Sequence, residues 1–189
     1  LRISGQRRAP IVFADQHFSL MTSPGNPSVD ILDGFNVFRD GMQYSVNLVS
    51  PLKGYYQVRN IATVFQSAEL LNELGFAIPE HCLGNGLRKV LDNTGLMGRW
   101  QILGQEPLTI CDVGHNPEGI RYNVNQLSAL APDRLHVVFG MVADKEIEQV
   151  LSLLPADAFY YFCRAKIPRA LDEHQLCREA ERTGLHGRA

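Results

Sequence analysis

The sequence concentrates its most reactive chemistry in one short segment, residues 112–117 (DVGHNP), which directly follows an apolar run. Asp112 would end a strand, where a carboxylate can accept hydrogen bonds from the vicinal hydroxyls of a ribose. Gly114 allows close approach of a ligand to the backbone, and the Asn-Pro pair is typical of a helix start. His115 would stand just ahead of that helix, where anions are favoured. The segment predicts a nucleotide or anion site, and a simple helix start with a surface histidine is the alternative.

Two later segments carry similar chemistry. Residues 140–145 (GMVADK) and 164–169 (RAKIPR) each follow an apolar run. Ligands of open parallel sheets bind outside the carboxyl ends of the strands, so the three segments together predict a site there. Lys145 could reach a phosphate or carboxylate, and the cations that include Arg169 could bind an anionic group. A solvated lysine and a solvated basic loop are the alternatives.

Two residues outside these segments also have suitable chemistry. Asn60 lies on the polar side of a predicted helix, where a solvent-facing asparagine is the alternative. Arg99 lies at a glycine-containing linker, and an arginine can hold a phosphate with two parallel hydrogen bonds across a cleft between domains. The sequence contains no GxxxxGK[ST] phosphate loop, GxGxxG fingerprint, GxSxG elbow or HExxH pair.

The first half of the sequence must position Asn60. Its apolar patterning predicts a buried strand over 11–14, strands over 35–38 and 42–48, and helices over 58–71 and 79–91. Asp40-Gly41 between two β-prone runs predicts a hairpin. Gly75 is a plausible stop for the first helix.

The second half alternates between strands and helices. Its patterning predicts strands over 108–113, 135–139 and 158–163, and helices over 117–130, 145–154 and 171–182. Strands separated by single helices predict a parallel sheet with right-handed crossovers. The linker over 93–98 is the expected boundary, so the predicted domains are 1–98 and 99–189.

Length and composition fit a globular protein and exclude several classes. The chain has 189 residues, 45% hydrophobic and 20% charged, with a formal charge of −2. This near-neutral balance argues against nucleic acid or an anionic membrane as a partner, and no apolar stretch is long enough to span a bilayer. Four widely spaced cysteines predict buried free thiols in a reducing cytoplasm. Because position 1 is leucine, we interpret the sequence as a piece of a longer protein.

Taken in order, five segments resemble the C-terminal half of the folylpolyglutamate synthase/dihydrofolate synthase family, within the Mur ligase superfamily. They are residues 54–60, like the family's G-x-H-Q-x-x-N-A; 95–101, like P-G-R-x-Q; 112–117, like D-[VG]-A-H-N-P; 140–147, like G-x-x-x-D-K-D; and 167–170, like x-x-P-R-A. Tyr56, Ile61 and Gly114 stand where the family has histidine, alanine and alanine. The resemblance implies an α/β fold, in which the end of a Mur-type central ATPase domain precedes a Rossmann-like C-terminal domain with a parallel sheet.

The activity that this resemblance implies is ATP-dependent amide-bond formation. A folate or dihydropteroate carboxylate takes the γ-phosphoryl group, and the amine of L-glutamate attacks the resulting acyl phosphate. The resemblance places Asn60 at the adenine, Arg99 at the phosphates and Asp112 at the ribose hydroxyls. His115, the catalytic candidate, would help to place the incoming amino acid or the nucleotide. No role follows for Lys145 or Arg169.

The resemblance also implies ATP and Mg²⁺ as cofactors, with the phosphate loop and the metal ligands upstream of residue 1. No metal ligand is therefore expected in the chain, and the fragment alone is expected to be inactive. The implied enzyme is a cytoplasmic monomer without nucleic acid or membrane partners. Another Mur-type ligase, acting on a peptidoglycan precursor, and a non-catalytic nucleotide-binding module are the alternatives.

Overall fold

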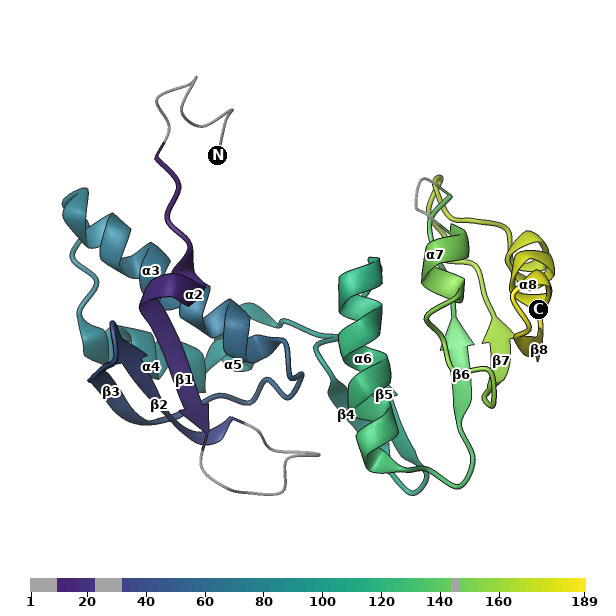
Figure 1. The fold of residues 1–189 in the computed structure, drawn as a ribbon, viewed down its shortest axis with the longest axis horizontal. Helices are drawn as coiled ribbons and strands as arrows, with labels where there is room; N and C mark the ends of the chain where they lie inside the picture. Colours follow the sequence, from purple (N-terminus) through teal and green to yellow (C-terminus); the bar gives the residue numbers. More distant parts are fainter. Residues whose placement is uncertain (1–9, 23–31, 144–146) are drawn as a thin grey trace. The chain divides into compact units, whose positions relative to one another are not determined.

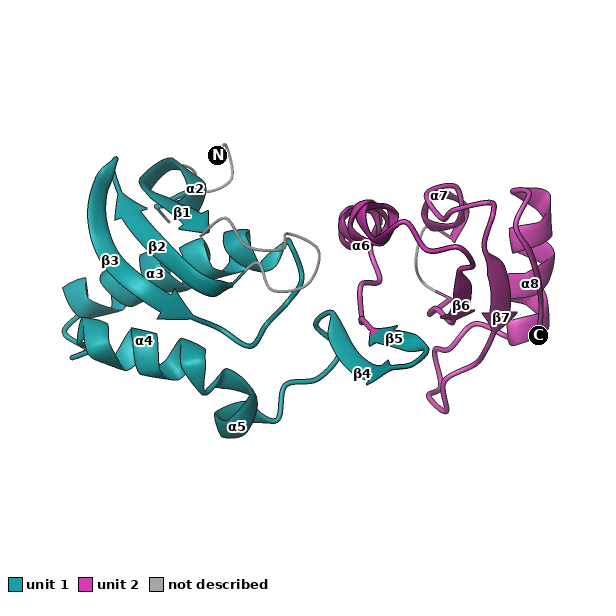
Figure 2. Cartoon of the chain, turned by 90° about the horizontal axis from the view of Figure 1, so that it is seen from below, with its two compact units in different colours: residues 1–110 teal, residues 111–189 magenta. Residues whose placement is uncertain are grey.

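The computed structural model describes residues 10–22, 32–143 and 147–189. It divides the chain into two units, Leu1–Ile110 and Cys111–Ala189, which Figure 2 colours separately. The division lies beyond the linker at which the sequence predicts a domain boundary, and the assignment of domains to 1–98 and 99–189 stays a prediction. Lys145 lies outside the described residues.

A three-stranded antiparallel sheet forms the framework of the first unit. Strands β1 (Phe18–Thr22), β2 (Asp33–Arg39) and β3 (Met42–Val49) pair in the order β1-β2-β3. The turn between β2 and β3 has Asp40 at φ 48° and Gly41 at φ 80°. Both turn residues are therefore left-handed, as a two-residue hairpin turn of the primed type requires. The predicted hairpin is confirmed.

Helices pack on this sheet. They are α3 (Gln57–Glu73), α4 (Glu80–Arg88) and α5 (Val90–Thr94). The shared core consists of Phe18, Leu32, Phe35, Val37, Leu52, Ile61, Ala62, Phe65 and Leu87. The predicted first helix is confirmed, and it ends before Gly75, whose φ is 94°. The predicted second helix is instead two short helices that meet at Lys89.

The strand predicted over residues 11–14 is wrong. Ile11, Val12 and Phe13 form no strand and are 40–48% exposed, and a short helix, α2 (Ala14–His17), follows them. A short apolar run does not by itself distinguish a strand from other structures. The strand of this region is β1, in which side chains from Phe18 onward alternate between buried or half-buried and exposed positions.

Strand β5 (Leu108–Cys111) differs from the strand that the sequence predicts over 108–113. It pairs with β4 (Gln101–Gln105), which was not predicted, in a two-stranded sheet of its own. Leu108 is 47% exposed, so the strand is not buried. The two residues between the strands, Glu106 and Pro107, form the turn of a hairpin. The prediction had placed this strand with the parallel sheet.

The second unit contains the parallel sheet that the sequence predicts. Strands β6 (His136–Phe139), β7 (Phe159–Phe162) and β8 (His186–Arg188) pair in parallel in that order, and β8 was not predicted. The helices are α6 (Pro117–Leu130), α7 (Ile147–Leu151) and α8 (Glu173–Arg182), of which α8 contacts β7 and β8 (Figure 1). The core of this unit consists of Leu151, Ala158, Tyr160, Phe162, Leu171, Leu176, Ala180 and Leu185. Within the described ranges, no helix combines the length and apolar character needed to cross a membrane.

The buried Tyr160 generates a prediction about stability and pH. Its side chain is fully buried, and its hydroxyl donates to the Pro155 carbonyl at 2.6 Å. Burial raises the pKa of Tyr160, and the negative charge of Asp157 raises it further. We expect Tyr160→Phe to lower the free energy of unfolding by about 1 kcal/mol at pH 7, because the hydrogen bond is lost.

The effect should depend on pH in one direction. Above the ordinary phenol pKa near 10, Tyr160 ionises in the unfolded chain before it does in the folded one, so this contribution to wild-type stability is lost as the pH rises. The phenylalanine variant has no group that ionises at this position. The difference in the free energy of unfolding between the two proteins should therefore become smaller as the pH rises. Urea unfolding of both proteins, followed by circular dichroism at pH 7 and pH 10.5, measures this difference in the free energy of unfolding. A difference that is the same at both values would contradict the prediction.

Candidate functional site

Asp112 follows β5 directly, and its carboxylate closes the loop that leads to α6. Its Oδ1 accepts a hydrogen bond from the Gly114 backbone N–H at 2.7 Å and another from Asn123 Nδ2 at 2.8 Å. Asp112 is half-buried. A carboxylate held by two donors on one oxygen has a fixed orientation, which is what recognition of a polar ligand requires.

The start of α6 is built as the sequence predicts. Asn116 has extended backbone dihedrals, and its side chain accepts a hydrogen bond from the Gly119 N–H at 2.7 Å. Pro117 occupies the first helical position, where its missing N–H costs nothing. The helix therefore begins immediately after the loop that carries Asp112.

His115 is exposed in the same loop, and its Nδ1 lies 3.2 Å from the Val113 carbonyl oxygen. A carbonyl only accepts hydrogen bonds, so Nδ1 must carry the proton of this contact. In the neutral ring, Nε2 is then the hydrogen-bond acceptor. Asp112 and His115 thus share one loop, with a carboxylate and an imidazole of defined tautomer.

The second and third predicted loops lie side by side. The Ala143 N–H donates to the Arg169 carbonyl at 2.9 Å, and the Leu171 N–H donates to the Met141 carbonyl at 2.9 Å. An antiparallel bridge joins the residues between them. The backbone thereby fixes the position of Arg169 relative to the loop that follows β6.

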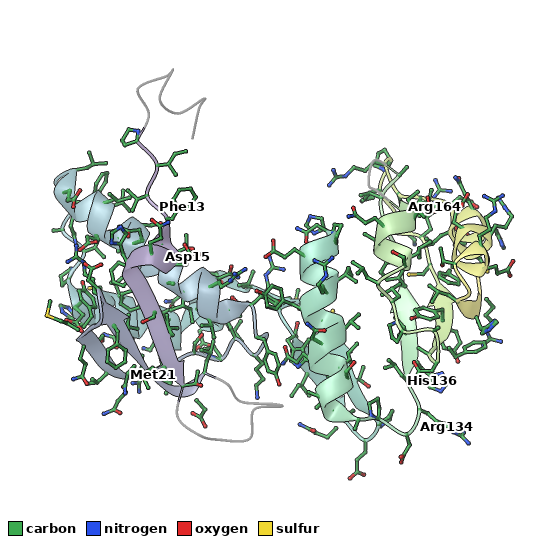
Figure 3. All side chains as sticks on the ribbon, in the orientation of Figure 1. Phe13, Asp15, Met21, Arg134, His136 and Arg164 are labelled. Atoms are coloured by element: carbon green, nitrogen blue, oxygen red, sulfur yellow. The ribbon has the colours of Figure 1, made fainter. Side chains whose placement is uncertain are left out.

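One cation of the third loop has an acidic neighbour. Arg164 Nη1 lies 3.9 Å from Asp172 Oδ2, and Figure 3 labels Arg164 near the end of β7. Asp172 also caps α8, since its Oδ1 accepts hydrogen bonds from the backbone N–H groups of Gln175 and His174. These bonds, that of Gln175 first, lower the pKa of Asp172. Its carboxylate thus stays ionised beside Arg164 at neutral pH.

The other two predicted residues lie in the first unit. Asn60 is exposed on α3, and its Nδ2 donates to Oε1 of the buried Gln57 at 3.0 Å. Arg99 is half-buried, and its Nη1 lies 3.4 Å from the Gly98 carbonyl oxygen. The four predicted side chains are therefore divided between the two units, two in each.

Two polar side chains that contact the predicted site residues were not predicted from the sequence. Gln57 contacts Asn60, and Asn123 contacts Asp112. Asn123 had a detectable signal, because it lies between Ile120 and Val124, which the spacing assigns to the inner side of the helix. A polar residue in that position needs a partner, and the partner is Asp112.

The described residues hold no cluster of three or more His, Cys, Asp or Glu side chains that could bind a metal ion. The thiols also differ from expectation. All four are free, but Cys82 and Cys163 are exposed and the other two are half-buried, so the prediction of buried thiols is wrong. Cys163 follows β7 at the sheet edge, where the apolar run that suggested burial has ended.

One cavity lies away from these loops. It measures about 510 Å³ and is lined by residues that include Leu127, Arg134, His136 and Phe159. His136 begins β6, and Figure 3 shows it and Arg164 toward opposite ends of the sheet. The loops after β6 and β7 lie instead at the carboxyl ends of parallel strands, where open parallel sheets bind ligands, whereas the Asp112 loop follows β5 of the two-stranded sheet.

The comparisons with known proteins agree with one another on the kind of protein that this chain resembles. Residues 98–189 match the family model described as Mur ligase, glutamate ligase domain. The sequence is 31% identical, over 70% of this chain, to a probable bifunctional folylpolyglutamate synthase/dihydropteroate synthase of Haloferax volcanii. The match covers 15% of that protein.

Two solved structures have a similar fold. Escherichia coli FolC in complex with DHPP and ADP gives a TM-score of 0.66 at 21% identity, over 98% of this chain and 40% of FolC. A bifunctional folylpolyglutamate synthase/dihydrofolate synthase with Mn, AMPPNP and L-glutamate bound gives 0.66 at 22% identity, over 98% of this chain and 40% of its own. The chain thus spans less than half the length of each of these proteins. These findings confirm the predicted fold class and the resemblance.

The Asp112 loop generates a prediction about Gly114. A Cβ at this position would lie 2.8 Å from Asn123 Nδ2 and 3.0 Å from Asp112 Oδ1. Gly114→Ala should therefore break the hydrogen bond between those two side chains and lower the free energy of unfolding by about 1–2 kcal/mol.

Gly86→Ala is the matched control, because a Cβ there meets nothing within 4 Å. Gly86 lies inside α4, where alanine should stabilise by about 0.5–1 kcal/mol. Urea unfolding of both variants gives the comparison. A Gly114→Ala protein as stable as the wild type would show that the contact carries no energy.

Proposed function

Because residues 98–189 match the family model described as Mur ligase, glutamate ligase domain, we propose that the chain is part of an ATP-dependent ligase that adds L-glutamate to a folate or dihydropteroate carboxylate. The observation that carries the proposal is the Asp112 loop, which presents a fixed carboxylate and an exposed imidazole ahead of α6. The names of the relatives favour a folate over a peptidoglycan precursor as the substrate.

The proposed reaction has two steps. The substrate carboxylate oxygen attacks the γ-phosphorus of ATP, and ADP leaves. The amine nitrogen of L-glutamate then attacks the acyl carbon, loses a proton, and inorganic phosphate leaves as the amide forms. Such chemistry depends mainly on positioning and on neutralisation of charge, and it requires exclusion of water from the acyl phosphate.

We assign each site residue a role in positioning. Asp112 accepts hydrogen bonds from the ribose hydroxyls, because its carboxylate is already fixed by two donors. Asn60 contacts the adenine through its amide, and Arg99 contacts the phosphates through its guanidinium. His115 places the incoming glutamate or the nucleotide through its exposed imidazole. The proposed domains are 1–98 and 99–189, with 95–98 as the hinge, and the match from residue 98 supports this boundary.

The other components of the reaction follow the family. A solved neighbour holds Mn with AMPPNP, which supports a divalent metal, and we propose Mg²⁺. The described residues offer no cluster of metal ligands, so we assign the metal no ligand in them. ATP, glutamate and folates are small polar molecules, which supports a cytoplasmic enzyme, and we propose that it acts as a monomer without nucleic acid or membrane partners.

The activity itself can be tested in the full-length protein that contains this chain. We expect release of ADP to require L-glutamate together with a folate or dihydropteroate. The 189-residue chain alone should release no ADP under the same conditions, because it contains no phosphate loop. A full-length protein without folate-dependent turnover, or clear turnover by the chain alone, would refute the proposal.

The role of Asp112 has a separate test. In the full-length enzyme, Asp112→Ala should raise the KM for ATP about tenfold or more, since hydrogen bonds to a charged group contribute roughly 1.5–3 kcal/mol. Asp133→Ala, which removes an exposed carboxylate of the same unit, should leave the KM unchanged. Steady-state kinetics with varied ATP measures both. Equal KM values for the two variants would remove Asp112 from the nucleotide site.

A further inference from the structure

The Asp112 carboxylate is held by a side chain that lies well along the next helix. Asn123, in the second turn of α6, donates from Nδ2 to Asp112 Oδ1 at 2.8 Å. The same oxygen accepts the Gly114 N–H at 2.7 Å. The loop supplies one donor and the helix supplies the other. Asn123 therefore joins the orientation of the carboxylate to a regular element of the fold.

The orientation of the Asn123 amide follows from chemistry. An ionised carboxylate only accepts hydrogen bonds, so the NH₂ group of the amide must face Asp112. Oδ1 of Asn123 then points elsewhere, and it is buried without a hydrogen-bond partner among the described residues. A buried acceptor without a partner costs about 1–3 kcal/mol. Asparagine is also a poor residue for a helix interior. The position thus carries a residue that is unfavourable for the helix and useful to Asp112.

The backbone makes room for this contact at Gly114. The φ of Gly114 lies outside the left-handed range, so glycine is not needed there for conformation. It is needed for space, because a Cβ would lie 2.8 Å from Asn123 Nδ2. The loop and the helix therefore have matched residues, a glycine in one and an amide in the other.

We propose that Asn123 is a positioning residue that sets the direction of the Asp112 carboxylate toward the ribose hydroxyls of ATP. The proposal rests on the proposed nucleotide role of Asp112. Asn123 acts on ATP only through Asp112. Its loss should therefore weaken ATP binding and the preference for ATP over 2′-deoxy-ATP, and should leave the chemical step largely intact.

The test replaces the amide by an apolar group of similar size. In the full-length enzyme, we expect Asn123→Leu to raise the KM for ATP about five- to tenfold, as loss of a hydrogen bond to a charged group predicts, with kcat within about twofold of wild type. The ratio of kcat/KM for ATP to that for 2′-deoxy-ATP should fall in parallel. Asn125→Leu, at an exposed position of the same helix, should change neither quantity.

Stability separates positioning from a structural role. Leucine favours a helix and removes the buried unpartnered oxygen, so Asn123→Leu should be as stable as wild type or more stable. In the 189-residue chain, exchange of the Gly114 amide proton should become several-fold faster, because its acceptor is no longer held. The proposal would be overturned if Asn123→Leu were less stable and its higher KM for ATP were explained by partial unfolding. It would also be overturned if the Gly114 amide proton exchanged at the same rate as in the wild type.

A double-mutant cycle distinguishes the possible failures. If Asn123 acts through Asp112, then Asp112→Ala with Asn123→Leu should have the same KM for ATP as Asp112→Ala alone. If Asp112→Ala alone leaves the KM unchanged, the nucleotide role of Asp112 is wrong, and this inference fails with it. If Asp112→Ala raises the KM but Asn123→Leu does not, only the positioning role of Asn123 is wrong.

Discussion

One carboxylate oxygen with two donors organises the candidate site. Asp112 Oδ1 connects the loop after β5 with the second turn of α6, over a separation of eleven residues. Gly114 provides the space, Asn116 begins the helix, and His115 is carried between them on the same short backbone. A charged group in so short a loop can be directed at a ligand only because neighbouring donors restrict its rotation.

A similar arrangement occurs in the first unit at smaller scale. The exposed Asn60 is held by the buried Gln57, one turn earlier on α3. In both places a polar residue expected to meet a ligand is restrained by an amide that belongs to a helix. This arrangement has a physical reason. A helix that packs against a core moves little, and a hydrogen bond from it restricts the motion of the side chain that contacts the ligand.

Local signals in the sequence predicted local features well. Asp40-Gly41 predicted the hairpin, and Asn116-Pro117 predicted the first residue of α6, because turn and cap geometries are determined by a few adjacent residues. Long-range features were less accessible. The pairing of β5 with β4 and the contact of Asn123 with Asp112 depend on residues that meet only after folding. The apolar run over 11–13 failed for the same reason, since no strand in the described part of the chain pairs with it. For the candidate site, the sequence indicated the residues of the loop, whereas Asn123, which holds Asp112, was marked only as a polar residue on the inner side of its helix.

Backbone hydrogen bonds join the loops after β6 and β7. The Ala143 and Leu171 N–H groups donate to carbonyls of the opposite loop, and side chains take no part in either bond. Substitutions in these loops can therefore change the charge and size of the side chains without removing the two backbone hydrogen bonds. Proline is the exception at positions 143 and 171, because it has no N–H to donate. At other positions of this edge, the side chains can thus change while these two backbone hydrogen bonds remain.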